Sequence, residues 1–158
     1  MNIRTKFGLF LDAMFFLVGG VANAVQTIEE AGSYVCVTDK WTESVQGEGH
    51  TMADFAGRCV LIPNDPAAAK IVEDCTGTYE YLPDRSWTGS GTCTQSTKGS
   101  DDKRFIKWEQ GSELEAPKYT ITGGTGRYEG ASGGGTTADE ELTDKLSAGT
   151  FEGTMELP

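Results

Sequence analysis

The stretch from Asp74 to Thr94 most restricts what this 158-residue chain can fold into. Two runs of alternating residues flank Pro83-Asp84-Arg85, which is typical of a tight turn between two strands. A hairpin centred on this turn places cysteines, aromatic residues and glycines on one face, and threonines, Ser90 and Glu80 on the other. A slip of one residue would mix the two faces, so the pattern predicts a single register. The predicted pairs on the first face are Cys75–Cys93, Gly77–Gly91, Tyr79–Gly89 and Tyr81–Trp87.

The four cysteines are expected to form two disulfides. Directly opposed residues of an antiparallel pair have α-carbons ~4.5–5.5 Å apart, which is within disulfide range. The hairpin register therefore predicts a Cys75–Cys93 bond and leaves Cys36 to bond Cys59. Pairings in which Cys75 and Cys93 bond elsewhere stay open. The chain has no CxxC pair and a single histidine, so we expect no zinc site, no other metal and no cofactor.

The first 24 residues have the composition of a secretory signal peptide. Arg4 and Lys6 precede an apolar run from Phe7 to Val18, and Ala22-Asn23-Ala24 is a small-residue cleavage site. The alternative is an uncleaved N-terminal anchor, but the apolar run is short for a membrane span. We therefore expect residues 25–158 to be one exported domain, periplasmic or secreted, without stable membrane insertion after cleavage. An even number of cysteines behind an export signal is typical of disulfide-bonded proteins.

The charge of the chain excludes one large class of partners. Removal of Arg4, Lys6 and Asp12 with the leader leaves 11 basic and 23 acidic residues, a formal charge of −12. Phosphate backbones repel a protein this acidic, so we do not expect nucleic-acid binding. The sequence predicts no oligomeric state.

A second hairpin is predicted between Tyr119 and Gly135. Tyr119 and Ile121 alternate with threonines as in a half-buried strand, and Tyr128 is expected to restart the strand after a turn. No Lys-Ser or Lys-Thr follows the glycines, so a phosphate-binding loop is not expected. Two sets of structural glycines are predicted in this hairpin. Positive φ at the reversal is expected of Gly123, Gly124 and Gly126, and close approach of another group is expected at Gly130 and Gly133.

The rest of the chain continues the β pattern. Residues 64–70 form either a loop or a helix of one or two turns, and in residues 104–110 Ile106 and Trp108 are expected to point inward. With further strands expected at 33–41, 57–63 and 150–157, the chain has about eight short strands and little helix. This count predicts an all-β fold, a small antiparallel eight-stranded (calycin-like) barrel, with a sandwich as the alternative.

An eight-stranded barrel has room for its own side chains or for one small ligand. The candidate ligand-binding residues are Tyr79, Tyr81, Trp87, Trp108, Tyr119 and Tyr128, with a filled core as the alternative. His50 is expected to be a solvated loop residue, and the acidic residues within 137–145 a solvated face. No catalytic residue is predicted.

Two segments resemble the allene oxide cyclase and dirigent-like barrel superfamily. They are Ile121–Gly133, similar to a late hairpin of those barrels, and Ala56–Ile62, similar to an inner strand. With its export signal, the chain resembles a distant, bacterial-type member. The resemblance implies an eight-stranded barrel with an apolar interior. The cyclases have a cysteine in the segment that contains Cys59, which we instead expect in a disulfide, and no residue here matches their catalytic glutamate.

Members of that superfamily direct cyclisation or coupling of reactive small molecules with few catalytic groups. The resemblance therefore implies an exported barrel that holds a small apolar or aromatic molecule. One alternative is a cyclase or isomerase that uses a buried carboxylate or tyrosine to move a proton. The other is a structural or surface-interaction domain with a filled barrel.

Overall fold

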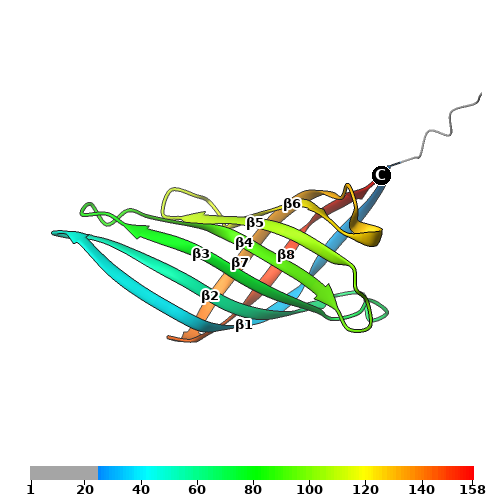
Figure 1. Cartoon of the computed structure of the whole chain (residues 1–158), viewed down its shortest axis with the longest axis horizontal. Coiled ribbons are helices and arrows are strands. Elements are labelled where there is room, and N and C mark those ends of the chain that lie inside the picture. The colour runs from blue at the N-terminus through cyan, green and yellow to red at the C-terminus, as the bar shows by residue number, and fades with distance from the viewer. Residues whose placement is uncertain (1–24) are drawn as a thin grey trace, which may run out of the picture.

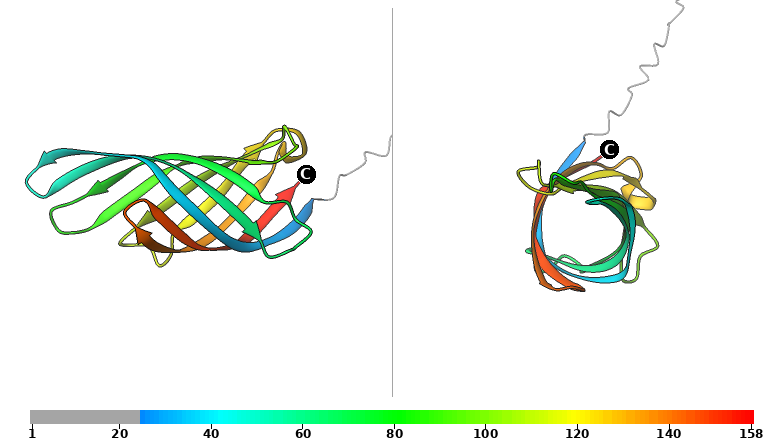
Figure 2. Two further views of the ribbon diagram at one scale, coloured as in Figure 1. Left: turned by 90° about the horizontal axis from the view of Figure 1, so that it is seen from below. Right: turned by 90° about the vertical axis from the view of Figure 1, so that its left-hand side faces the viewer.

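Eight strands close into one antiparallel barrel in the computed structural model, which describes residues 25–158 (Figure 1). Each strand pairs with its neighbours in the sequence, and β8 pairs with β1 to close the sheet. The barrel is seen end-on in Figure 2. The predicted eight-stranded antiparallel barrel is thus confirmed, whereas the predicted signal peptide lies outside the described residues.

Most strands are longer than the segments predicted for them. Residues 33–41 and 57–63 contain the strongest β-formers of β1 and β2, but both strands continue well beyond them. Among residues 25–158, no helix is long and apolar enough to cross a membrane. The elements are β1 (Gln26–Gly47), β2 (His50–Pro63), β3 (Ile71–Tyr81), β4 (Trp87–Thr97), β5 (Lys103–Gly111), β6 (Lys118–Gly124), the 3₁₀ turn η1 (Gly126–Tyr128), β7 (Ser132–Thr143) and β8 (Leu146–Leu157).

The β3–β4 hairpin has the predicted register at every pair from Cys75–Cys93 to Tyr81–Trp87. Its turn is closed by the amide of Leu82, which donates to the carbonyl of Ser86 over 2.9 Å. Both predicted disulfides are confirmed, with α-carbons 4.1 Å apart in this hairpin and 4.0 Å apart in Cys36–Cys59. One disulfide therefore links β1 to β2 and the other links β3 to β4.

The glycine-rich hairpin differs from the prediction at its turn. Tyr128 does not restart the strand, because residues 126–128 form η1 and β7 begins only at Ser132. The amides of Tyr128 and Glu129 donate to carbonyls three residues earlier, which keeps this segment in a tight turn. Gly126 has φ of 58°, as expected for the reversal, whereas Gly124 does not have positive φ and instead packs against the Lys103 carbonyl.

Residues 64–70 form a loop, so the helical alternative is wrong. The Asp65 carboxylate accepts a hydrogen bond from the amide of Ala67 over 2.9 Å. This local bond closes a turn, but the following residues do not continue it as a helix.

Two clusters form the core inside the barrel. One is centred on the Cys75–Cys93 disulfide with Ile106 and Ile121, and the other on Cys59 with Phe151. Large rings lie over inward-facing glycines, because glycine leaves space above the sheet. A Cβ atom on Gly77 would overlap with Cζ2 of Trp108, so this indole lies directly against the backbone of β3.

This contact predicts that a single methyl group added at Gly77 destabilises the fold. We expect Gly77→Ala to lower the free energy of unfolding by about 1–3 kcal/mol, because the methyl group must displace the Trp108 ring. Gly47→Ala is the control, since no atom lies within 4 Å of the added Cβ. Urea unfolding of both variants with intact disulfides measures the difference. Equal stability of the two variants would contradict the packing described here.

Candidate functional site

The barrel encloses a cavity of about 1020 Å³ that all eight strands line. The turns that join β1 to β2, β3 to β4, β5 to β6 and β7 to β8 lie at one end of the barrel, because the strands alternate in direction. The lining of the cavity reaches these turns, at Lys118 and at Asp144-Lys145, and we call this end the mouth. The opposite end, near both ends of the described chain in Figure 1, is the floor.

The floor carries a hydrogen-bonded network of charged side chains. Arg104 is only 4% exposed, and its Nε donates to Oε1 of Gln95 over 2.6 Å. Its Nη1 forms an ion pair with Oε1 of Glu30 at 2.5 Å. Gln95 in turn donates from Nε2 to Oε1 of Glu73 over 2.8 Å. One guanidinium group is thus linked to two carboxylates inside the barrel.

The environment of Glu73 favours its protonated form. Burial raises the pKa of this carboxyl, and the hydrogen bond from Gln95 and the charge of Arg104 oppose the shift without cancelling it. Glu73 therefore keeps its proton to a higher pH than an exposed glutamate does. A carboxyl group of this kind inside a cavity is able to donate a proton to a bound molecule.

An aromatic wall lies between the floor and the mouth. Its centre is Tyr79, whose ring centroid lies 5.0 Å from that of Trp41 and 5.6 Å from that of Trp108. Burial raises the pKa of Tyr79 to about 12, and Gln110 donates a hydrogen bond to its hydroxyl. This residue therefore stays neutral across the physiological range. The other rings in contact with Tyr79 are Phe55, Tyr81 and Trp87.

Five of the six aromatic residues singled out from the sequence line this cavity: Tyr79, Tyr81, Trp87, Trp108 and Tyr119. The sixth, Tyr128, lies in η1 and is absent from the lining. Its ring lies under the guanidinium group of Arg127, 4.8 Å from the ring centroid. The role of these residues in binding a ligand stays a prediction.

The acidic stretch expected to be a solvated face is part of β7 and contributes to the mouth. Strand alternation turns Asp139 and Glu141 toward the cavity, while Glu140 does not line it. The hydroxyl of Tyr34 donates to the Asp139 carboxylate, and partial burial raises the pKa of that carboxyl. These acids remain accessible to solvent, but three acids of the stretch, Asp139, Glu141 and Asp144, are part of the cavity lining.

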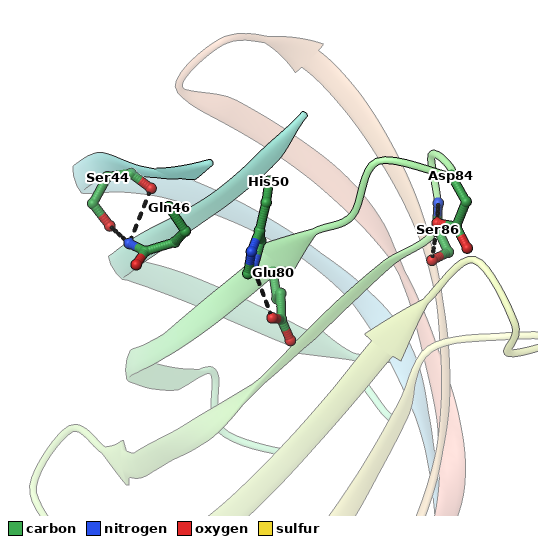
Figure 3. A network of polar contacts seen from close by, with 6 residues as sticks. All are labelled: Ser44, Gln46, His50, Glu80, Asp84 and Ser86. Atoms are coloured by element: carbon green, nitrogen blue, oxygen red, sulfur yellow. Dashed lines mark hydrogen bonds and ion pairs between the residues drawn. The ribbon is translucent and has the colours of Figure 1, made fainter. Parts of the chain in front are cut away.

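His50 is not the free loop residue that the sequence suggested. It is the first residue of β2, and its Nε2 lies 2.9 Å from Oε1 of Glu80 (Figure 3). Neither residue lines the cavity. Two local contacts in the same view, Ser44 with Gln46 and Asp84 with Ser86, stabilise the neighbouring turns. The only histidine is therefore not part of the candidate site.

Sequence reasoning missed the charged floor, although the signal for part of it was present. The register that opposes Cys75 to Cys93 also opposes Glu73 to Gln95, one inward pair further along the hairpin. Arg104 precedes the inward residue Ile106 by two positions, so alternation places it on the same face. Glu30 could not be found in this way, because it meets Arg104 only through closure of the barrel.

Three polar atoms of the lining are buried without a hydrogen-bond partner among the described residues. They are Oε2 of Glu30, Nε1 of Trp108 and the hydroxyl of Tyr119. A buried polar group without a partner costs about 1–3 kcal/mol. Because these atoms are closed off from solvent, a bound molecule would reach them only after their side chains turn.

One group of side chains has the spacing of metal ligands. The sulfurs of Cys59 and Cys75 and a carboxylate oxygen of Glu73 lie within 4.8 Å of one another. Both sulfurs are held in disulfides, so neither is a thiolate that could bind a metal ion. These residues therefore form part of the cavity wall.

Comparisons with known proteins identify the fold. No protein-family model and no curated protein matches the chain. Among solved structures, the pterocarpan synthase dirigent protein GePTS1 superposes with a TM-score of 0.56 at 10% sequence identity, over 84% of this chain and 91% of that chain. This barrel has the dirigent-like fold. The pterocarpan synthase dirigent protein PsPTS1 gives a TM-score of 0.50 at 10% identity, over 85% of this chain and 95% of that chain.

The likeness to these dirigent proteins concerns the fold alone, because only a tenth of the residues are identical. It agrees with the superfamily resemblance of the two segments and with the eight-stranded barrel. The chemistry of this dirigent-like barrel follows from its own lining.

The buried tyrosines predict a loss of stability at alkaline pH. Burial, and then the negative charge of Glu30, raises the pKa of Tyr119 to about 12, as burial does for Tyr79. Unfolded tyrosine titrates near 10, so between pH 10 and 12 the unfolded chain loses these protons first. The free energy of unfolding is therefore unaffected by these groups below pH 10 and falls as the pH rises toward 12.

Urea unfolding at pH 9 and pH 11 measures this effect, and Tyr79→Phe should reduce the difference between the two pH values. An unchanged difference in the variant would show that Tyr79 titrates normally. Absorbance near 295 nm, which follows tyrosinate formation, gives an independent reading of the same pKa.

Proposed function

We propose that this dirigent-like barrel is an exported protein that holds a small aromatic molecule in its cavity. The observation that carries the proposal is the cavity of about 1020 Å³ inside a closed barrel, with an aromatic wall centred on Tyr79. Ligand pockets in proteins commonly measure about 300–1,000 Å³ and combine apolar walls with a few polar groups. This cavity has the same construction, so it favours a small-molecule site over a filled structural barrel.

The distribution of side chains suggests how a molecule would lie. The rings around Tyr79 and Trp108 offer faces on which a planar molecule can stack. The floor offers the Glu30, Glu73 and Arg104 charges, and the mouth offers access between the hairpin turns. We therefore propose that the aromatic part of the molecule lies against the wall and that its polar end points to the floor.

Export is the second part of the proposal. Two disulfides are consistent with an oxidising compartment, and the signal-peptide pattern of residues 1–24 accounts for how the chain would reach it. We propose cleavage after Ala24, with the periplasm or the outside medium as the destination.

A cyclase or isomerase is the second candidate function, and the state of Glu73 favours it. A carboxyl group beside the cavity whose pKa is raised by burial could donate a proton to one atom of a bound molecule and accept one from another. Such a reaction needs no cofactor and leaves the composition of the molecule unchanged. Two solved proteins with this fold are named pterocarpan synthase dirigent proteins, which supports an enzyme as a candidate for this barrel.

The binding proposal predicts that filling the cavity abolishes binding. Thr137 lines the cavity, whereas the adjacent residue Ala138 is exposed and does not. We expect Thr137→Trp to lose binding of 1-naphthylmethanol by isothermal titration calorimetry and Ala138→Trp to bind it as the unaltered protein does. Equal binding by both variants would place the probe outside the barrel.

The proposal also makes a prediction for protein that is purified from the cell that exports it. Native mass spectrometry should give the mass of residues 25–158 with four oxidised cysteines, together with a co-purifying small molecule. A leader-bearing mass would contradict export with cleavage, and a barrel that neither carries a molecule nor binds the probe would favour the filled or structural alternative.

The enzyme candidate predicts a separation of binding from turnover. If Glu73 donates the proton, the co-purified molecule or its precursor should change its chromatographic retention but not its mass on incubation with the protein. Glu73→Gln that is saturated with the same molecule should leave its retention unchanged, because the amide cannot donate the proton as an acid. Turnover by Glu73→Gln at the original rate would exclude this role.

A further inference from the structure

We infer that the cavity takes an aromatic molecule that carries an amine, with the ammonium group held at the floor by Glu30 and Glu73 and the ring against the aromatic wall. This inference rests on the proposed function, because it assigns the chemistry of the molecule proposed there.

The charge balance of the floor is the first observation. Glu30 and Glu73 are joined through Gln95 and Arg104 into one unit that holds two carboxyl groups and one guanidinium group. The Glu30 side chain is 16% exposed and Arg104 is 4% exposed, so water contributes little to the balance. The Nε and Nη1 atoms of Arg104 already donate to Gln95 and Glu30. A cation from a ligand would therefore favour the ionised form of Glu73 and balance its charge.

The unpaired atoms at the floor are the second observation. Oε2 of Glu30 accepts no hydrogen bond from the described residues, and the hydroxyl of Tyr119 is also without a partner. The two lie in one region, because the Tyr119 hydroxyl approaches Gly153, which pairs with Glu30 across β1 and β8. An ammonium group has three donors and can serve both oxygens once the Glu30 carboxylate turns about the oxygen bonded to Arg104.

The composition of the whole lining is the third observation. Seven acidic and four basic residues line the cavity, a formal balance of −3, and the whole chain has a formal charge of −11. A negative field of this kind attracts cations and opposes anions. The faces of Trp108 and Tyr79 add a favourable interaction with a cation, and with the ring that carries it. A neutral or anionic ligand uses only the aromatic part of this surface.

Three naphthalene compounds of similar size test the inference, because they differ mainly in the charge of one group. At pH 7 and low salt, 1-naphthylmethylamine is a cation, 1-naphthylmethanol is neutral and 1-naphthoate is an anion. Isothermal titration calorimetry with the disulfide-bonded protein should give the amine at least about tenfold tighter binding than the alcohol, with the carboxylate weakest.

The possible outcomes distinguish the amine assignment from the small-molecule function. An alcohol that binds as tightly as the amine, or a carboxylate that binds most tightly, would overturn the amine assignment and leave the small-molecule function standing. Binding by none of the three would remove the proposed function, and the amine assignment with it.

A matched pair of variants locates the ammonium group. Glu30→Gln should weaken the amine about tenfold and change the affinity for the alcohol little, because only the charge at the floor is altered. Glu29→Gln, with the same change on an exposed neighbour in β1, should leave both affinities unchanged. An equal loss for amine and alcohol in Glu30→Gln would contradict the assignment. Circular dichroism checks that this variant folds; if it does not, the three-compound series on the unaltered protein decides.

Discussion

Pairing of β1 with β8 is the constraint on which the rest of the molecule depends. Closure satisfies the backbone hydrogen bonds that would otherwise be exposed at two sheet edges, and it encloses every second side chain of eight strands. A residue's chemistry then depends on which face it lies on. The inward faces bring together groups more than 70 positions apart in the chain, such as Arg104 and Glu30. Neither the core nor the cavity exists without this contact between the first and last strands.

The interior is divided along the barrel axis by the direction of its strands. The early part of β1, β3 and β5 and the late part of β4 reach the floor, and there they carry Glu30, Glu73, Arg104 and Gln95. The aromatic residues lie closer to the mouth, where rings such as Trp108 lie over glycines of the neighbouring strands. A molecule in the cavity would therefore meet an aromatic wall along its length and a polar floor at its end. This asymmetry is what suggests a ligand with one aromatic part and one polar part.

The two disulfides stabilise the part of the barrel formed by β1 to β4, and three of these strands carry residues of the floor. They link β1 to β2 and β3 to β4, on strands that also carry Glu30, Glu73 and Gln95. Each closes a loop of about 20 residues and is expected to contribute about 3 kcal/mol by restricting the unfolded chain. Such support suits a buried charged network, because ionic groups inside a protein are costly to bury.

The sequence alone determined the features that depend on local alternation. The register from Cys75–Cys93 to Tyr81–Trp87, both disulfides, the all-β class and the shared face of Ile106 and Trp108 all follow from period-two patterns around recognisable turns. The turn after Gly124 was misjudged, because several glycines allow more than one path and the 3₁₀ bonds of residues 126–128 decide between them.

Only the tertiary structure decided which face is inside and which residues meet there. Alternation groups Glu73 with Cys75 and Arg104 with Ile106, but it does not say that Glu30 completes their network or that β7 turns Asp139 toward the mouth. Those contacts join strands that are distant in the sequence, and they form only when the sheet closes. The physical reason is that local patterns specify the two faces of each strand, whereas the curvature and closure of the whole sheet select the face that encloses the cavity.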